Sequence, residues 1–306
     1  MQLPFVKLHG LGNDFVVVDN MDSSISLTPE QVVHICDRHF GVGADGVILV
    51  QPSPHDNCIA YMHYINSDGT LAEMCGNGIR CFAKFLCDNN YVDNDQTSFF
   101  ADTKRGPLQL QIHRDEKGNF ESATVDMDEP ILDAEQIPTL LASDFCKQVN
   151  ECAVLEQTIQ SPWGEFAFTC ISMGNPHAIC FLDAIETLPD EWFFSNEKSL
   201  ETFKLNEIGS YFESHEVFPA KSNIEFIVPA KDGLHMRVYE RGCGETLACG
   251  TGACATLVAS VLTNRSKRQN NVILRGGILH ITWDKDTNHV FMTGPAEQSF
   301  TGVIQL

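Results

Sequence analysis

Two short turns that combine a cysteine with glycines stand directly before segments with helical spacing of apolar residues. The first reads Met74-Cys75-Gly76-Asn77-Gly78 and the second reads Ala248-Cys249-Gly250-Thr251-Gly252. Each cysteine is predicted at the N-terminus of a helix, where the helix dipole favours the thiolate and lowers the pKa of the thiol. The backbone N–H groups of such a turn also bind carboxylate or phosphate. Two of these turns in one chain predict two acid/base groups that face one anionic substrate.

The surroundings of the two turns are alike. After each turn, apolar residues recur at i, i+3, i+4 and i+7: Ile79, Phe82, Ala83 and Leu86 in one case, and Cys254, Leu257, Val258 and Val261 in the other. A short strand-like run ends nine residues before each cysteine, at Asn66 and at Glu240. We therefore predict that a strand–turn–helix unit is duplicated within the chain.

The rest of the chain reads mainly as short strands joined by polar turns. Strands are predicted at 16–18, 47–50, 108–112 and 224–228. Thr28 and Pro29 predict the start of a helix that covers 29–38. The segment 184–205, in which aromatic residues stand among acidic ones, is interpreted as a peripheral helical insertion.

Length and charge limit the architecture and the partners. A chain of 306 residues is suited to two domains of about 150 residues each. We place the domains at 1–125 together with 296–306, and at 126–295. The net charge of −21 argues against nucleic acid or an anionic membrane as a partner, because no basic field is available to hold phosphates.

The twelve cysteines indicate reduced thiols rather than a disulfide framework. The N-terminus lacks a basic segment followed by an apolar one, so we expect no targeting signal and a cytoplasmic location. No two cysteines stand three apart, so no metal site of the C-x-x-C type is predicted. Cys243, inside a Gly-Cys-Gly turn, is the one cysteine whose role stays open besides Cys75 and Cys249.

Six motifs, in order along the chain, resemble the signature of the diaminopimelate epimerase family. They are Gly10-Leu11-Gly12-Asn13-Asp14-Phe15, Asn66-Ser67-Asp68-Gly69, Met74-Cys75-Gly76-Asn77-Gly78-Ile79-Arg80-Cys81, Gly174-Asn175-Pro176-His177, Asn223-Ile224-Glu225-Phe226, and the run from Glu240 to Ala255. The resemblance extends from residue 8 to Gly294-Pro295-Ala296 and so covers nearly the whole chain.

This resemblance implies an α/β (α+β) fold of two pseudo-symmetric domains, each a mixed β-sheet or barrel wrapped around a central helix, with the site in the cleft between them. It implies a cofactor-independent epimerase that interconverts LL- and meso-2,6-diaminopimelate, a small-molecule substrate of lysine and peptidoglycan precursor biosynthesis. We expect no cofactor and no metal, and we expect the protein to form a homodimer. Inversion at an α-carbon needs one base and one acid on opposite faces, and by resemblance these are Cys75 and Cys249.

Further site residues follow from the same resemblance. The helix N-termini, through Gly76, Asn77, Gly250 and Thr251, are expected to bind the α-carboxylate and stabilise carbanionic charge. The distal ammonium and carboxylate are expected to meet Asn13, Asn66, Asn175, Asn223, Glu240 and Arg241. His177 is expected beside the thiols. Some family members carry glutamine where this chain has Gly46, so Gly46 is left out of the site.

Two other functions stay open at this point. A proline or hydroxyproline racemase could use the same scaffold, although Arg241 and four asparagines suit a second charged end, which proline lacks. A catalytically silent binding protein with this fold would not require both Cys75 and Cys249.

Overall fold

The computed structural model describes residues 1–72 and 74–306. The chain divides into two compact units. Unit 1 comprises Met1–Asp126 and Thr293–Leu306, and unit 2 comprises Met127–Met292. Each unit is built mainly of strands around one long buried helix, and each is described separately below.

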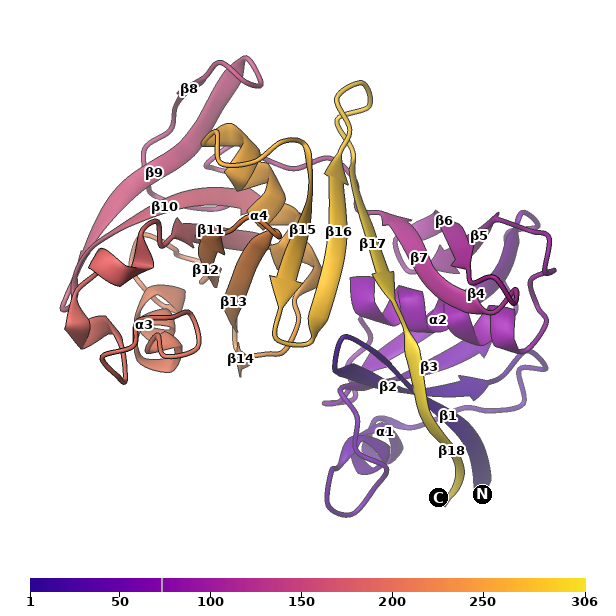
Figure 1. Cartoon of the computed structure of the whole chain (residues 1–306). Coiled ribbons are helices and arrows are strands. Elements are labelled where there is room, and N and C mark those ends of the chain that lie inside the picture. Colours follow the sequence, from indigo (N-terminus) through magenta and orange to yellow (C-terminus); the bar gives the residue numbers. More distant parts are fainter. Residues whose placement is uncertain (73) are drawn as a thin grey trace. The chain divides into compact units, whose positions relative to one another are not determined.

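Unit 1 is a mixed sheet of eight strands. These are β1 (Gln2–Gly10), β2 (Asn13–Asp19), β3 (Gly46–Gln51), β4 (Cys58–Asn66), β5 (Ser98–Thr103), β6 (Gly106–Arg114), β7 (Phe120–Asp126) and β18 (Glu297–Gln305). They pair in the order β18-β1-β2-β3-β4-β5-β6-β7, and the β2–β3 and β4–β5 pairs are parallel while the others are antiparallel. Figure 1 shows β1 and β18 side by side, with the two chain ends next to each other.

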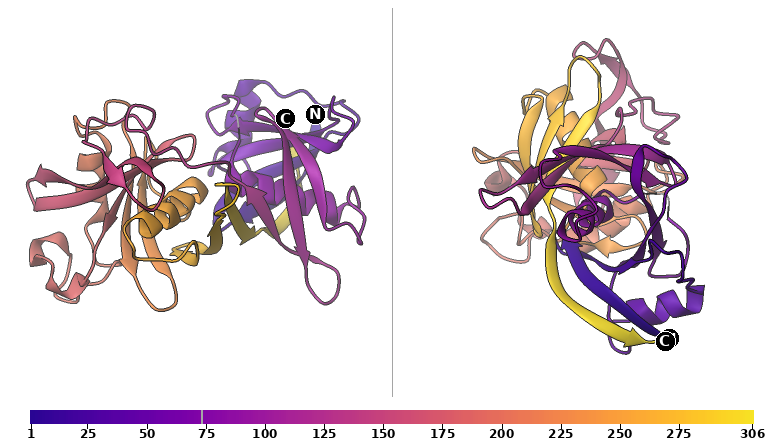
Figure 2. Two further views of the ribbon diagram at one scale, coloured as in Figure 1. Left: turned by 90° about the horizontal axis from the view of Figure 1, so that it is seen from above. Right: turned by 90° about the vertical axis from the view of Figure 1, so that its right-hand side faces the viewer.

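Helix α2 (Gly76–Asp88) lies inside this sheet and contacts β1, β2, β3, β4 and β7 (Figure 2). All of its residues except Lys84 and Asp88 are buried. A helix that is covered on nearly all sides must be apolar almost all round, and the Ile-Cys-Phe-Ala-Phe-Leu-Cys content of α2 meets that condition. Helix α1 (Pro29–Cys36) packs against β3 and shares a second apolar cluster with β1 and β2.

Unit 2 contains strands β8 (Asp144–Cys146), β9 (Glu151–Ser161), β10 (Gly164–Ser172), β11 (Pro176–Phe181), β12 (Asn223–Pro229), β13 (Leu234–Glu240), β14 (Gly244–Glu245), β15 (Gln269–Leu274) and β16 (Gly277–Trp283). Strand β17 (Val290–Pro295) continues from unit 2 into unit 1. Helix α4 (Gly250–Leu262) contacts β10, β11, β12, β13, β15 and β16, and only Thr251 and Val261 of this helix are not buried.

The predicted duplication is confirmed by the strand pairing. In unit 1 the pairs along β1-β2-β3-β4-β5-β6 are antiparallel, parallel, antiparallel, parallel and antiparallel. In unit 2 the pairs along β10-β11-β12-β13-β15-β16 follow the same alternation. The long helix follows β4 in one unit, and in the other it follows β13 and the two-residue strand β14. The repeat is therefore larger than the strand–turn–helix unit predicted from the sequence.

The predicted helix at 29–38 is present as α1, and its start has the expected chemistry. Thr28 Oγ1 accepts from the backbone N–H of Gln31, and the side chain of Gln31 accepts from the backbone N–H of Thr28. This reciprocal arrangement satisfies two N–H groups that an uncapped helix would leave without partners.

The prediction of a peripheral helical insertion at 184–205 is wrong. The segment contains two 3₁₀ turns, Ile185–Thr187 and Asp190–Trp192, and helix α3 (Leu205–Glu213) begins only at its end. Trp192 and Phe193 are buried in the core of unit 2, and the ring of Trp192 stacks on Phe166 with centroids 4.1 Å apart. Trp192 and Phe193 therefore anchor this segment to the core, whereas Phe194 is exposed.

No helix in the described part of the chain is long and apolar enough to cross a membrane.

Candidate active site

Cys75 is the N-cap residue of α2, as predicted, and its side chain is half-buried. Its Sγ accepts from the backbone N–H of Gly78 at 3.5 Å and donates to Asn13 Oδ1 at 3.7 Å. An N–H that points at the sulfur stabilises its negative charge, as does the positive end of the helix dipole. The Gly78 N–H and the helix start therefore favour the thiolate that a base requires, while the contact with Asn13 suits the thiol.

A buried arginine organises the first turn of α2. Arg80 is fully buried and donates to Gly76 O at 3.0 Å, to Asn77 Oδ1 at 2.9 Å and to Pro295 O at 3.2 Å. The amide of Asn77, fixed in this way, donates through Nδ2 to Asn13 Oδ1 at 3.1 Å. Arg80 also explains Gly10, because a Cβ atom at this position would lie 3.0 Å from the guanidinium. Three of the predicted site residues, Cys75, Asn77 and Asn13, are thus brought together.

A network of charges holds Asn13 at the start of β2. Asn13 Nδ2 donates to Asp45 Oδ2 at 2.6 Å, and Arg38 binds both Asp14 and Asp45. Lys7 pairs with Asp14 at 2.7 Å. Burial opposes ionisation of Asp14, but hydrogen bonds and charges from Arg38 and Lys7 outweigh burial and lower the pKa of Asp14 to about 2. Asp14 and Asp45 therefore belong to the charged network that fixes the position of Asn13.

Asn66 ends β4 at the same edge of the sheet where β2 and β3 begin. Its side chain donates to Thr70 Oγ1 at 3.0 Å within its own turn. Its partner in the ladder is Gly46, where an added Cβ would lie 2.5 Å from the Tyr64 ring and 2.7 Å from Ile65 O. This backbone has no room for a side chain at Gly46, which agrees with leaving it out of the predicted site.

Cys249 is the N-cap residue of α4, but its surroundings differ from those of Cys75. It is only 5% exposed, and its Sγ lies 3.6 Å from Thr251 Oγ1. Burial, followed by the charges of Glu240 and Glu225, raises the pKa of Cys249 well above the ordinary value for a thiol. The pKa lowering expected from the helix dipole alone is therefore wrong for this cysteine, which rests as a thiol.

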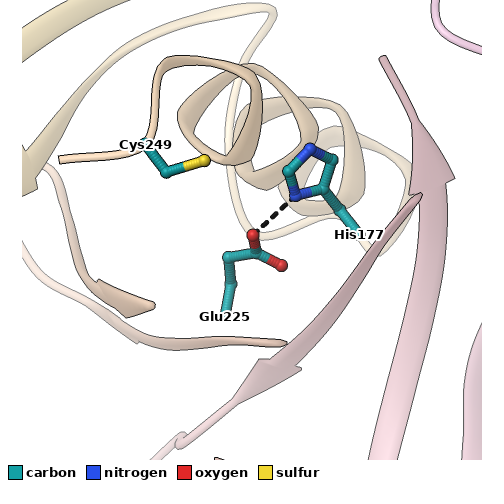
Figure 3. Close-up of side chains that lie close together, drawn as sticks. All are labelled: His177, Glu225 and Cys249. Carbon is teal, nitrogen blue, oxygen red and sulfur yellow. Dashed lines mark hydrogen bonds and ion pairs between the residues drawn. The ribbon is translucent and has the colours of Figure 1, made fainter. Parts of the chain in front are cut away.

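His177 and Glu225 form a fully buried pair next to Cys249 (Figure 3). His177 Nδ1 lies 2.6 Å from Glu225 Oε1, and His177 Nε2 lies 3.1 Å from Asn175 Oδ1. Since both ring nitrogens are engaged, the orientation of the imidazole is fixed. Within the described part of the chain, His177, Glu225 and Cys249 are the one group of His, Cys, Asp or Glu residues whose ligand atoms are close enough to hold a metal ion.

The remaining predicted residues of unit 2 lie at the ends of β11, β12 and β13. Asn223 donates to Pro176 O at 2.8 Å and accepts from the backbone N–H of Arg241 at 2.9 Å. The exposed side chain of Arg241 donates to Ala220 O at 3.2 Å. Glu240 accepts a short hydrogen bond from the Thr246 hydroxyl. Asn223 therefore fixes the backbone from which Arg241 extends.

Two residues with clear roles here were absent from the predicted site. Glu225 belongs to one of the six motifs, but no role was predicted for it, although a carboxylate in a buried apolar strand must find a partner. Arg80 also belongs to a motif, lies in an otherwise apolar helix, and had no predicted role. In both cases the signal was a single charged residue within an otherwise apolar segment.

Each unit thus presents a cysteine at the N-terminus of a buried helix, and the two cysteines have different neighbours. The model of the diaminopimelate epimerase family matches residues 5–132 and 169–298. Diaminopimelate epimerase from Synechocystis is 46% identical over 309 residues and covers all of both chains. The chloroplastic diaminopimelate epimerase of Oryza sativa subsp. japonica is 45% identical over 98% of this chain and 79% of its own.

Solved structures with low sequence identity share the fold. A hydroxyproline epimerase from Agrobacterium vitis aligns with a TM-score of 0.67 at 14% identity, over 99% of this chain and 91% of its own. A PhzF-family phenazine biosynthesis protein from Bacillus anthracis aligns with a TM-score of 0.67 at 15% identity over the full length of both. These two structures confirm the predicted fold class of two pseudo-symmetric α/β domains. The family model and the relatives with similar sequences identify the family among proteins of this fold. The chain belongs to the diaminopimelate epimerase family.

Proposed function

We propose that this protein is an isomerase that interconverts LL- and meso-2,6-diaminopimelate by inversion at one α-carbon, without a cofactor. The observation that carries the proposal is the pair of N-cap cysteines, one in each unit, within a chain 39–47% identical to named diaminopimelate epimerases over nearly its whole length. A role in lysine biosynthesis accompanies this activity.

In the proposed mechanism Cys75 and Cys249 act on opposite faces of the α-carbon. Cys75, whose sulfur accepts from Gly78 N–H, removes the α-proton as a thiolate. Cys249, whose pKa is raised by burial and by two carboxylates, delivers a proton as a thiol. The roles exchange when the other epimer is bound. Each compact unit then serves as one catalytic domain that supplies one acid/base group.

The helix N-termini supply the electrostatic stabilisation. Backbone N–H groups in the first turns of α2 and α4, at Gly76, Asn77, Gly250 and Thr251, are proposed to bind the α-carboxylate and the negative charge that develops at the α-carbon. Such groups cost little reorganisation during the reaction, because the buried helices already hold them in place.

The distal end of the substrate is proposed to bind Asn13, Asn66, Asn175, Asn223, Glu240 and Arg241. Asn13 and Asn223 are held by hydrogen bonds to Asp45 and to Pro176 O respectively, so neither side chain needs to be ordered by the substrate. Preorganised groups bind more tightly because the entropy of ordering them is already lost.

The reading as a proline or hydroxyproline racemase has less support. The likeness to a hydroxyproline epimerase amounts to 14% identity and indicates the fold alone, whereas the diaminopimelate epimerases share three times that identity. A cytoplasmic location and a homodimer stay predictions, the second to be checked by the mass of the protein in solution.

The proposal is tested with single alanine variants of the two cysteines. We expect Cys75→Ala and Cys249→Ala each to lower kcat/KM for LL-diaminopimelate by at least about a thousandfold, because each removes a group that transfers a proton in the transition state. Cys152→Ala, which changes an exposed cysteine on β9, is the matched control and keeps wild-type activity. Chiral separation of the epimers measures the rates. Near-normal activity of either alanine variant at position 75 or 249 would contradict the two-base assignment.

A further inference from the structure

We propose that unit 2 contains a binding site for a soft divalent cation, with Zn²⁺ the best match, formed by His177, Glu225 and Cys249. The three residues offer an imidazole nitrogen, a carboxylate oxygen and a sulfur, which are the three ligand types that Zn²⁺ takes in proteins. They come from β11, β12 and the N-cap of α4, and all three are buried (Figure 3). The site therefore lies on rigid elements within one compact unit.

The distances between the three ligand atoms are close to those that a bound Zn²⁺ ion requires. The three ligand atoms all lie within 4.8 Å of one another, and His177 Nδ1 and Glu225 Oε1 are 2.6 Å apart. Ligands of tetrahedral Zn²⁺ at the usual bond lengths stand roughly 3.3–3.6 Å apart. Insertion of the ion therefore needs the imidazole and carboxylate to part by about 1 Å or less and the sulfur to approach by at most about 1.5 Å.

The outer contacts are those of a metal-binding histidine. A ligating histidine donates its other ring N–H to a carbonyl or carboxylate oxygen, which fixes the tautomer. Asn175 Oδ1 accepts at 3.1 Å from His177 Nε2, so Nδ1 is the nitrogen directed at the carboxylate, and it becomes a ligand once the proton shared with Glu225 Oε1 is lost.

Glu225 supplies an independent indication of a missing partner. Its residue is fully buried, and its Oε2 has no hydrogen-bond partner in the described part of the chain. A buried carboxylate oxygen left in this way is costly, and a cation bound next to the carboxylate would offset that cost. Glu240 adds a further negative charge, since it is one of the groups that raise the pKa of Cys249.

Gly252 allows the carboxylate and the sulfur to come close to the start of α4. A Cβ atom at Gly252 would lie 2.7 Å from Glu225 Oε1 and 3.2 Å from Cys249 Sγ. A side chain at this position would therefore displace two of the three proposed ligands. With a thiolate, a carboxylate and a neutral imidazole, the bound ion would form a cluster without net charge, which suits a buried site.

Binding of Zn²⁺ would block catalysis rather than support it. The ion binds the thiolate, so Cys249 must release its proton to solvent, and the proton that His177 Nδ1 shares with Glu225 Oε1 must be released as well. Cys249 can then neither accept nor donate a proton at the α-carbon. This inhibitory consequence rests on the proposed function, whereas binding itself does not. Because binding releases a proton from a thiol of raised pKa, affinity is expected to increase with pH.

The test uses the whole chain, stripped with a chelator and titrated with Zn²⁺ in competition with a chromophoric chelator. We expect one ion per chain, an affinity at least about tenfold weaker in each of Cys249→Ser, His177→Gln and Glu225→Gln, and unchanged binding in Cys243→Ser and Cys152→Ser, which alter exposed cysteines. With Cd²⁺, a thiolate-to-metal charge-transfer band should appear in the wild type and be absent from Cys249→Ser. Melting temperatures identify any variant that fails to fold. If another variant fails, the Zn²⁺ affinity of Cys249→Ser decides whether the site exists, because this substitution hardly changes the size of the side chain.

The outcomes separate the two proposals. Zn²⁺ binding that persists in Cys249→Ser and Glu225→Gln, or that is lost in Cys243→Ser, would overturn the site while leaving the function untouched. Binding as expected in a protein without epimerase activity would overturn the proposed function and leave the site. In an active enzyme, Zn²⁺ should inhibit in proportion to occupancy, and added chelator should restore the rate.

Discussion

At the scale of single residues, the two cysteines hold equivalent positions and meet unlike neighbours. Cys75 contacts an amide and a backbone N–H, whereas Cys249 lies near two carboxylates. The sequence predicted both N-cap positions correctly, because a glycine-rich turn before an apolar period is a local signal. The carboxylates near Cys249 belong to Glu225 on β12 and Glu240 at the end of β13, outside the helix that Cys249 caps, so helical periodicity could not predict their effect on its pKa.

Arg241 is the residue whose proposed role concerns the choice of substrate. Arg241→Ala should lower kcat/KM for diaminopimelate on the order of 30- to 1,000-fold, or about 2–4 kcal/mol, because the distal carboxylate loses a charge-assisted bidentate partner. Arg241→Lys should recover little, since an ammonium lacks the planar fork. Steady-state kinetics measure both variants.

The matched control for Arg241 is Lys231→Ala. Lys231 is also exposed and cationic, but it lies in the turn between β12 and β13, at the other end of the same hairpin from Asn223 and Arg241. An Arg241→Ala enzyme with wild-type kcat/KM would place recognition of the distal carboxylate elsewhere.

At the scale of elements, the first turns of α2 and α4 share a sequence pattern, but they differ in whether a side chain fits at the glycine three residues after the cysteine. Gly78 and Gly252 occupy the same position, three residues after the N-cap cysteine. An added Cβ at Gly78 would make ordinary contacts of 3.4 Å or more, whereas at Gly252 it would lie 2.7 Å from Glu225 Oε1. Periodicity predicted both helices, but it could not show that the second glycine is required by a neighbouring strand.

Gly252→Ala should therefore lower kcat by about a hundredfold, because displacement of Glu225 or Cys249 by about 1 Å spoils the geometry of proton transfer. Gly78→Ala, which keeps the N–H that faces Cys75, should lower kcat far less and should raise the melting temperature, since alanine stabilises a helix interior by about 0.5–1 kcal/mol relative to glycine. Kinetics and calorimetry on the pair check this contrast. Equal losses in the two variants would show that the packing at Gly252 has no special part in catalysis.

The segment 184–205 shows where reasoning about elements from sequence failed. Its aromatic residues among acidic ones predict a peripheral helical insertion, yet the segment contains two 3₁₀ turns, and Trp192 and Phe193 are buried. Short irregular segments take their conformation from tertiary packing, which local periodicity does not encode.

At the scale of the whole molecule, the repeated alternation of parallel and antiparallel pairs accounts for the two matching helix starts. The sequence predicted the repeat from only one strand, one turn and one helix, because the other strands have diverged beyond recognition in a single chain. Strand order is set by contacts between distant segments, so it had to come from the structure. The family resemblance supplied the fold class that periodicity alone left open.

The central claim is that two different groups transfer protons on the two faces of one α-carbon. The most direct measurement is the reaction of LL-diaminopimelate in D₂O at low conversion, with deuterium at the α-carbons measured separately in the two epimers. We predict that nearly every meso product molecule carries one deuteron at the inverted carbon, while the remaining LL substrate stays almost unlabelled, because the base removes hydrogen from one face and the exchanged thiol delivers deuterium to the other. Product that retains the original hydrogen, or substrate labelled as fast as product, would contradict the two-base account.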